Sequence, residues 1–198
     1  MAVGIQILEL VVRTATWIFL IALVARFLAQ IARASFHNPL AHTIVVITNP
    51  VLQPARRIIP GIAGMDIACL FLIWLTQWLY GLFMVFVVHG AEVSLLQIAL
   101  WALVAVGGIF LEVLRWSMII VAIGSWITAG QGNPFIGFLT QIAEPFVAPF
   151  RRFNLQIGMM DFTYLLVFMV IIILKDIVLM NIASAVQYAP QFRLFIGM

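Results

Sequence analysis

Long runs of apolar residues alternate with shorter, more polar connections along this chain of 198 residues. The pattern predicts four membrane-spanning helices, at about residues 5–27, 67–89, 95–126 and 162–185. The second run gives the clearest signal, since residues 67–88 contain no Asp, Glu, Lys, Arg or His. About 20 apolar residues in helical form cross the hydrocarbon core of a bilayer. The sequence therefore predicts an all-α membrane protein.

The two long connections between spans carry the same motif, which indicates an internal repeat. Residues 38–66 and 133–161 align without a gap at an offset of 95. Seven non-aliphatic residues recur: Asn38, Pro39, Pro50, Pro54, Arg56, Arg57 and Asp66 correspond to Asn133, Pro134, Pro145, Pro149, Arg151, Arg152 and Asp161. The first and third spans align at an offset of 99, which places Trp17 on Trp116. The chain is therefore expected to be a tandem pair of one helix–loop–helix unit.

The two expected units, residues 1–91 and 92–198, each contain two spans, so both enter the membrane in the same direction. Such a parallel repeat predicts a pseudo-two-fold axis along the membrane normal. The long connections hold five arginines, whereas the short loop near residues 90–94 holds an acid and the C-terminal tail holds Arg193. Basic loops favour the cytoplasmic side. We expect a multi-pass protein of the bacterial inner membrane, with cytoplasmic long loops and both termini periplasmic.

An Asn-Pro pair is expected to start a helix in each long connection, because Asn caps free amides and Pro fits the first helical position. Apolar residues then recur at helical spacing and predict short amphipathic helices at about residues 39–49 and 134–144. We expect Pro50 and Pro145 to end these helices, since proline lacks the amide donor and clashes with the preceding turn. The helices either lie in the membrane interface or form a re-entrant segment.

The double-arginine pairs, residues 56–57 and 151–152, follow these helices. One interpretation is that they hold the loops on anionic lipid headgroups. Another is that an arginine of each pair binds the aspartate that begins the next span, Asp66 or Asp161. A third is that the four arginines gather near the pseudo-two-fold axis and bind a ligand or a protein.

Charged residues within the spans are candidates for function, because burial of charge in lipid is unfavourable. Helix spacing suggests a polar layer in the outer half of the bilayer: Arg13, Glu112, Arg115, Lys175 and Asp176. Local pairs Glu9–Arg13 and Glu112–Arg115 suit the spacing of a helix. Arg13 and Glu112 occupy equivalent repeat positions and are also placed to pair across the axis. Both structural pairing and a transport or proton-linked role remain open.

The composition and the scarce reactive residues mainly exclude classes of function. The chain is 65% hydrophobic and only 9% charged, with a mean hydropathy of +1.19. Cys69 is the one cysteine, so the sequence holds no disulfide and no CxxC pattern, and we interpret this thiol as a small buried residue. His37 and His42 are poorly spaced to share a helix face, and no motif for nucleotide binding or hydrolysis is present. We expect no cofactor, no metal, no nucleic-acid contact and no enzymatic activity.

The paired blocks, in which Asn-Pro precedes two prolines, Arg-Arg and Asp, resemble the YggT family of bacterial membrane proteins in its duplicated form. The resemblance covers nearly the whole chain. The second block departs from the first at Glu144, which replaces Asn49, and it has no counterpart of Pro60. The two copies are therefore not assumed to be equivalent. The resemblance implies a plasma-membrane location and supplies no catalytic residues.

Two functions follow as hypotheses from these observations. The resemblance implies a role in osmotic or ion homeostasis, for which the polar layer would line a pathway. The alternative is a scaffold or assembly factor that recruits partners through its arginine-bearing loops, as in the cell division, chromosome distribution or haem-protein assembly linked to the family. A small bundle of four spans favours a homo-oligomer for conduction, and another membrane protein is the partner expected of a scaffold.

Overall fold

The computed structural model describes residues 2–34, 38–62, 64–128, 133–157, 160–188 and 195–198. Helices account for nearly all regular structure in these ranges. The first copy contains α1 (Ala2–Ile31), α2 (Pro39–Ile58), α3 (Ile67–Leu82) and the π-helical turn η1 (Phe83–Val88). The second contains α4 (Leu95–Thr128), α5 (Pro134–Val147), the 3-10 helix η2 (Ala148–Phe153), strands β1 (Gln156–Ile157) and β2 (Met160–Asp161), α6 (Thr163–Ile173), the π-helical turn η3 (Leu174–Leu179) and α7 (Met180–Ala185).

The four predicted spans are confirmed as long apolar helices. They cover Val3–Ile31, Ile67–Val88, Leu95–Gly124 and Thr163–Ala185. Each is long enough to cross a bilayer of about 30 Å at 1.5 Å per residue. The molecule is therefore an all-α membrane protein, as the hydropathy pattern predicts.

The repeat extends to a detail of the backbone that the aligned motif does not reveal. Ile157 pairs with Met160 in the two-residue β1–β2 hairpin. In the first copy the equivalent residues, Ile62 and Met65, form an isolated antiparallel bridge. Each copy thus makes the same tight reversal immediately before the aspartate that precedes its second span.

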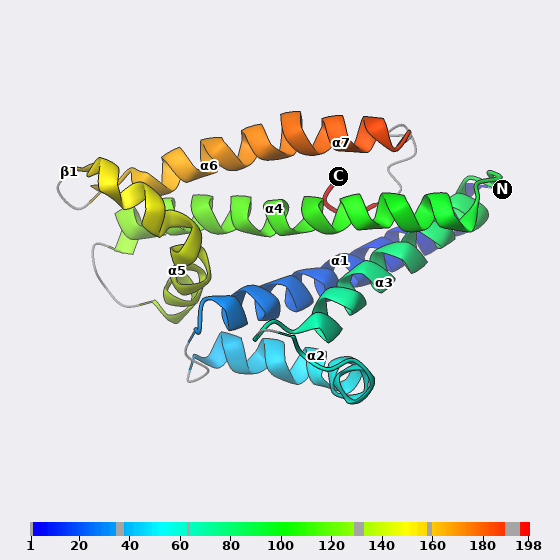
Figure 1. Cartoon of the computed structure of the whole chain (residues 1–198), viewed down its shortest axis with the longest axis horizontal. Helices are drawn as coiled ribbons and strands as arrows, with labels where there is room; N and C mark the ends of the chain where they lie inside the picture. Colours follow the sequence, from blue (N-terminus) through cyan, green and yellow to red (C-terminus); the bar gives the residue numbers. More distant parts are fainter. Residues whose placement is uncertain (1, 35–37, 63, 129–132, 158–159, 189–194) are drawn as a thin grey trace.

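The spans pack as two pairs, α1 with α3 and α4 with α6, and α3 also packs along α4. In Figure 1, α4 lies between α6 and the α1–α3 pair, and the two pairs diverge away from the end that holds the N-terminus. Helices α2 and α5 lie toward the diverging end and contact each other. Helix α5 contacts α1, α4 and α6 there, whereas α2 packs against α1 and α3 on the side away from α4.

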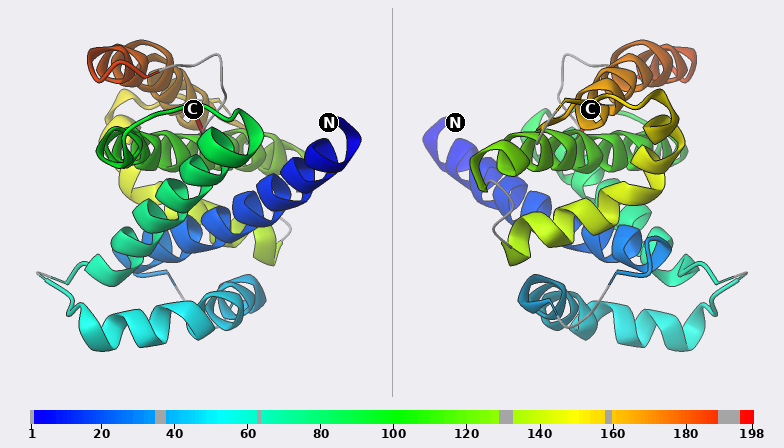
Figure 2. Two further views of the ribbon diagram at one scale, coloured as in Figure 1. Left: turned by 90° about the vertical axis from the view of Figure 1, so that its right-hand side faces the viewer. Right: turned by 90° about the vertical axis from the view of Figure 1, so that its left-hand side faces the viewer.

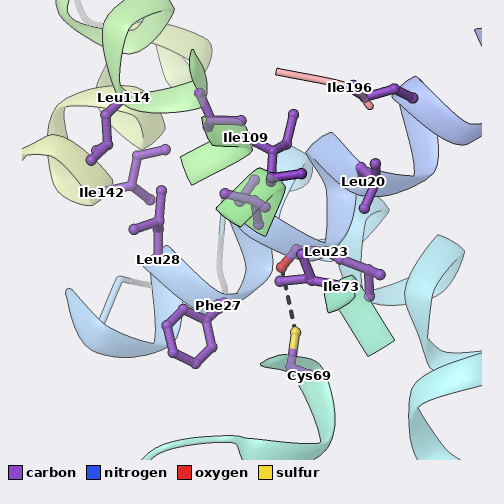
Figure 3. Close-up of a cluster of buried hydrophobic side chains, with 14 of the residues drawn as sticks. Leu20, Leu23, Phe27, Leu28, Cys69, Ile73, Ile109, Leu114, Ile142 and Ile196 are labelled. Carbon is purple, nitrogen blue, oxygen red and sulfur yellow. Dashed lines mark hydrogen bonds between the residues drawn. The ribbon is translucent and has the colours of Figure 1, made fainter. Parts of the chain in front are cut away.

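The core lies in the middle of the bundle, where the second half of α1 meets α3, α4 and α5. Leu23, Leu28, Ile73, Ile109 and Ile142 are fully or almost fully buried there (Figure 3). The first half of α1 is mostly exposed, which leaves apolar surface for lipid. In a bilayer such surface is expected, since lipid tails are as apolar as the side chains that face them.

Prolines do not end the amphipathic helices, which corrects the expectation from sequence. Helix α2 runs through Pro50 and Pro54 to Ile58, and α5 runs through Pro145 to Val147. The three proline rings lie on exposed positions, so the helix can accommodate the missing hydrogen bond by bending. Figure 2 shows α2 bent between its two halves. The prolines therefore shape these helices instead of stopping them.

The C-terminal residues return into the bundle. The fully buried Gln77 donates from Nε2 to the Ile196 carbonyl at 2.7 Å and accepts from the Ile196 amide at 3.3 Å. A Cβ at Gly108 would lie 2.8 Å from the carbonyl oxygen of Gly197. Gly108 therefore makes room for this segment. Its neighbour Gly107 does face a helix, with Leu179 of η3 at 3.2 Å from the same hypothetical atom.

Candidate functional site: the arginine pairs and the intramembrane charges

The first arginine of the first copy is tied to the start of the next span. Arg56 forms an ion pair with Asp66, with Nε at 3.0 Å from Oδ2. The other carboxylate oxygen of Asp66 accepts the Cys69 amide at 3.1 Å and so caps α3. Asp66 is only 5% exposed. The predicted arginine–aspartate pair is present here, and it fixes the end of α2 against the beginning of α3.

The second copy builds a larger version of the same contact. Arg151 lies 3.1 Å from Asp161 and 2.8 Å from Glu144, and its guanidinium lies over the ring of Tyr164. Asp161 also accepts the Thr163 amide at 2.9 Å. Glu144 replaces Asn49 of the first copy, so the departure from the repeat noted in the sequence adds a second carboxylate to the arginine.

Charges and hydrogen bonds within this cluster shift the pKa values of Arg151 and Asp161. Hydrogen bonds with Glu144 raise the pKa of Arg151 above its usual value. Burial by itself would raise the pKa of Asp161, but hydrogen bonds from Thr163 and Gln156 and the charge of Arg151 lower it below its usual value. Both shifts favour the charged forms. The cluster is therefore a stable ion-pair network near neutral pH.

The second arginine of each pair has a different environment. Arg57 and Arg152 are exposed, and Arg152 lies over the Phe153 ring at 5.1 Å. The four arginines therefore do not form one cluster of equivalent groups. Arg56 and Arg151 form ion pairs with carboxylates of the chain, whereas Arg57 and Arg152 are exposed and take part in none of the ion pairs of the described residues.

The two Asn-Pro motifs start α2 and α5 as predicted. Asn38 accepts the Leu40 amide, and Asn133 accepts the amide of Phe135 at 2.9 Å. The Asn38 side-chain amide also donates to the Pro134 carbonyl at 2.6 Å. This contact joins the first turns of α2 and α5, so the two repeat motifs meet across the interface between the copies.

A buried arginine was not singled out from the sequence. Arg26 is 8% exposed and donates to the Thr48 hydroxyl and, at 3.3 Å, to the Val45 carbonyl. Thr48 is fully buried. Pro50 follows Thr48 by two residues, so Arg26 supports the bent part of α2. The sequence signal is an arginine near the end of an apolar span, which gives no indication of its partner in α2.

Part of the expected polar layer exists as a compact cluster. The Glu112 carboxylate pairs with Arg115 on its own helix and with Lys175 on η3, and it accepts the Trp116 indole N–H at 2.8 Å. Glu112 is 16% exposed and Lys175 13% exposed. The π-helical turn displaces the register of the span where it carries Lys175, a type of irregularity that often lies at functional positions. Arg115 Nε is a buried donor that has no acceptor within the described residues.

The other expected members of the layer lie elsewhere. Arg13 is exposed and lines a separate cavity of about 420 Å³ with Trp17 and Tyr80. Among the ion pairs of the described residues, Arg13 pairs with neither Glu9 nor Glu112, and the Glu112 carboxylate contacts Arg115, Lys175 and Trp116. Asp176 is exposed on the outer face of η3. The layer of five residues is therefore reduced to a triad of Glu112, Arg115 and Lys175.

Some expectations concern positions beyond the described residues. His37 and Arg193 lie outside them. Cys69 is buried, with Sγ 3.5 Å from the Leu23 carbonyl (Figure 3). In the ranges that the structure describes, no group of three His, Cys, Asp or Glu side chains could hold a metal ion.

The four apolar helices, the repeated motif and its repeated contacts define the class as a membrane protein of two tandem helix–loop–helix units. The sequence profile of the CCB3/YggT family matches residues 3–87 and again residues 100–182. This chain belongs to that family.

Similar curated proteins are found in several bacteria. "Uncharacterized protein PA0392" of Pseudomonas aeruginosa is 34% identical over 187 residues, which cover 94% of this chain and 95% of the relative. "Uncharacterized protein YggT" of Escherichia coli K12 is 26% identical and covers 91% of each chain. A protein of Vibrio alginolyticus, described as "Uncharacterized protein in proC 3'region", is 33% identical over 76% of this chain and 82% of its own length. No solved structure matches the chain significantly.

Proposed function

We propose that this chain is a non-enzymatic scaffold of the bacterial inner membrane, which recruits partner proteins to the cytoplasmic surface through Arg57 and Arg152. The observation that carries the proposal is the division within each double arginine. One guanidinium ties the amphipathic segment to the following span, and the next one is exposed. A motif used only to build the fold has no need of the second, exposed charge.

The surroundings of the exposed arginines support recruitment at a membrane surface. The exposed face of α2 carries Val46, Ile47 and Val51 beside the basic end of the helix. An apolar face next to basic residues suits binding in the interface of an anionic leaflet. The proposal therefore includes anionic headgroups as the immediate neighbours of Arg57 and Arg152, with a protein partner bound over them.

The test compares the two arginines of each pair by crosslinking in native membranes. The double variant Arg57→Gln/Arg152→Gln is expected to fold normally and to lose specific proteins that crosslink to the wild type. Arg56→Gln/Arg151→Gln is the matched control with the same change in charge, and it should reduce thermal stability in detergent. An unchanged set of crosslinked proteins in the folded Arg57→Gln/Arg152→Gln variant would contradict recruitment through these residues.

Osmotic or ion homeostasis is the second candidate, and the triad of Glu112, Arg115 and Lys175 supports it. Ionisable groups inside spans often mark ion or proton pathways. The same triad also suits a structural role, because Glu112 forms ion pairs with both cations and so joins α4 to η3, and for this reason we place recruitment first. Under the ion hypothesis, the double variant Glu112→Gln/Lys175→Gln should abolish ion flux into reconstituted vesicles while the protein stays folded. Equal flux in vesicles with and without the wild-type protein would remove this candidate.

A further inference from the structure

A concave apolar groove lies where the two copies meet. Its volume is about 530 Å³. Its walls come from α1 and α4, and its floor comes from α2 and α5. The lining residues are mostly apolar: Trp17, Ile21, Ala25, Leu40, Ile44, Glu112, Val113, Trp116, Ser117, Ile120, Phe135, Phe138, Leu139 and Ile142. Pockets that bind small apolar ligands in proteins have volumes in this range and few polar groups.

The lining follows the internal repeat. Trp17 and Trp116 are equivalent at the offset of 99, and so are Ile21 and Ile120. The floor shows the same relation at the offset of 95, which pairs Leu40 with Phe135 and Ile44 with Leu139. The groove is therefore lined by equivalent positions of the two copies and is built jointly by both.

Ser117 and Glu112, which line the groove, already have hydrogen-bond partners within the protein. Ser117 donates its hydroxyl to the Val113 carbonyl at 2.8 Å. Glu112 already accepts from Arg115, Lys175 and Trp116. A cavity holds ordered water only where two or more polar groups are available to bind it. An empty apolar groove would also lose the dispersion contacts of its lining, so a hydrocarbon is the matching occupant.

The groove opens toward the surroundings of the bundle. Three of its lining residues, Trp17, Trp116 and Phe135, are 46%, 50% and 45% exposed. Because the two helices that form its walls, α1 and α4, span a membrane, the material outside this opening is lipid. We propose that the groove is a binding site for one acyl chain of a membrane phospholipid. Ala25 lies eight residues after Trp17 in α1, so the site takes a segment of about 12 Å and not a whole lipid.

A second copy of the protein is a less suitable occupant. A helix with its side chains is about 10–12 Å wide, and the floor of the groove is closed by α2 and α5, whose first turns are joined by the Asn38–Pro134 hydrogen bond. A flexible single chain can follow such a groove, whereas a helix would contact only its rim.

The site can be tested on the full-length wild-type protein in vesicles of phosphatidylethanolamine and phosphatidylglycerol. A phosphatidylglycerol with a photoactivatable diazirine in one acyl chain is added in increasing proportion, and crosslinked residues are mapped by mass spectrometry. Labelling of Trp17 and Leu139 should saturate at one lipid per chain. Labelling of Leu103 and Met169, which are exposed elsewhere on the spans, should rise in proportion to the probe. Proportional labelling at all four positions would overturn the proposal.

Variants that fill the groove provide an independent measurement. Ile44→Trp and Leu139→Trp place a large ring on the floor at equivalent positions of the two copies and should lower the saturable labelling of Trp17 several-fold. Val46→Trp is the matched control, since it adds the same ring to the exposed face of α2 outside the groove. Unchanged saturable labelling in both filled variants would also overturn the proposal.

Discussion

The two copies share a framework but secure their amphipathic helices in different ways. In the first copy, α2 is 20 residues long and is held by Arg26 through Thr48 and by Arg56 through Asp66. In the second, α5 ends after 14 residues and continues as η2, where Arg151 binds two carboxylates. The repeat therefore specifies where each segment begins and where its arginine is tied, whereas the neighbours decide how firmly it is held.

The largest difference in loss of unfolding free energy is expected between substitutions of Glu112 and of its repeat equivalent Arg13. Replacing Glu112 with Ala leaves Arg115 and Lys175 without their counter-charge within the bundle, which should cost about 3 kcal/mol of unfolding free energy. Arg13→Ala removes an exposed side chain and should cost less than about 0.5 kcal/mol. Unfolding of the purified protein in mixed micelles with increasing SDS measures both. Similar losses at the two positions would show that the triad is not the dominant charged contact.

A smaller difference in unfolding free energy is expected between substitutions of Asp66 and of Asp161. Asp66→Ala removes both a buried cap and the ion pair with Arg56, and should cost about 2 kcal/mol. Asp161→Ala should cost about 1 kcal/mol, because Arg151 is partly exposed and keeps Glu144 as a partner. The same SDS titration compares them, with Asp176→Ala as an exposed control. A greater loss for Asp161→Ala would reverse our ranking of the two contacts.

The hydrogen bond from Arg26 to Thr48, which holds α2 in the first copy, should have a measurable but modest effect on stability. Thr48→Val keeps the shape of the side chain and removes the hydroxyl that accepts from Arg26, with an expected cost of about 1 kcal/mol. Hydrogen exchange should become faster in α2 and stay unchanged in α5. Equal acceleration in both helices would indicate that the copies do not hold their amphipathic segments independently.

The smallest effect is a dependence on pH that belongs to the second copy. The lowered pKa of Asp161 means that its charged form stabilises the fold above the usual aspartate pKa of about 3.9. This contribution is lost as pH falls through the lower pKa of the folded protein. The stability difference between wild type and Asp161→Asn should therefore be constant near neutral pH and shrink in acid. A difference that grows on acidification would contradict the sign of the shift.

The spans and the repeat were predictable because they depend on composition and on order along the chain. Asn38 and Asn133 start helices through local hydrogen bonds, and Asp66 lies ten residues after Arg56, so these contacts also follow from sequence. The course of α2 through Pro50 was mispredicted, since a local rule for proline says nothing of the tertiary contacts that let a helix bend and continue.

Contacts between distant segments were the least predictable. Arg26 with Thr48, Lys175 with Glu112, and Gln77 with Ile196 each depend on how helices rotate against one another. The π-helical turns contribute to this difficulty, because an extra residue within a turn shifts every later side chain around the helix axis. Spacing along the helices therefore grouped Arg13 with Glu112 in one layer, whereas the structure does not pair them.

The hydrogen bond from Asn38 to Pro134 has an evolutionary consequence. A protein made of one such unit would present the start of its amphipathic helix without this neighbour, and it could regain the contact by forming a homodimer. In a tandem chain the two halves need not be identical, and Arg13 and Glu112, which occupy equivalent repeat positions, carry opposite charges.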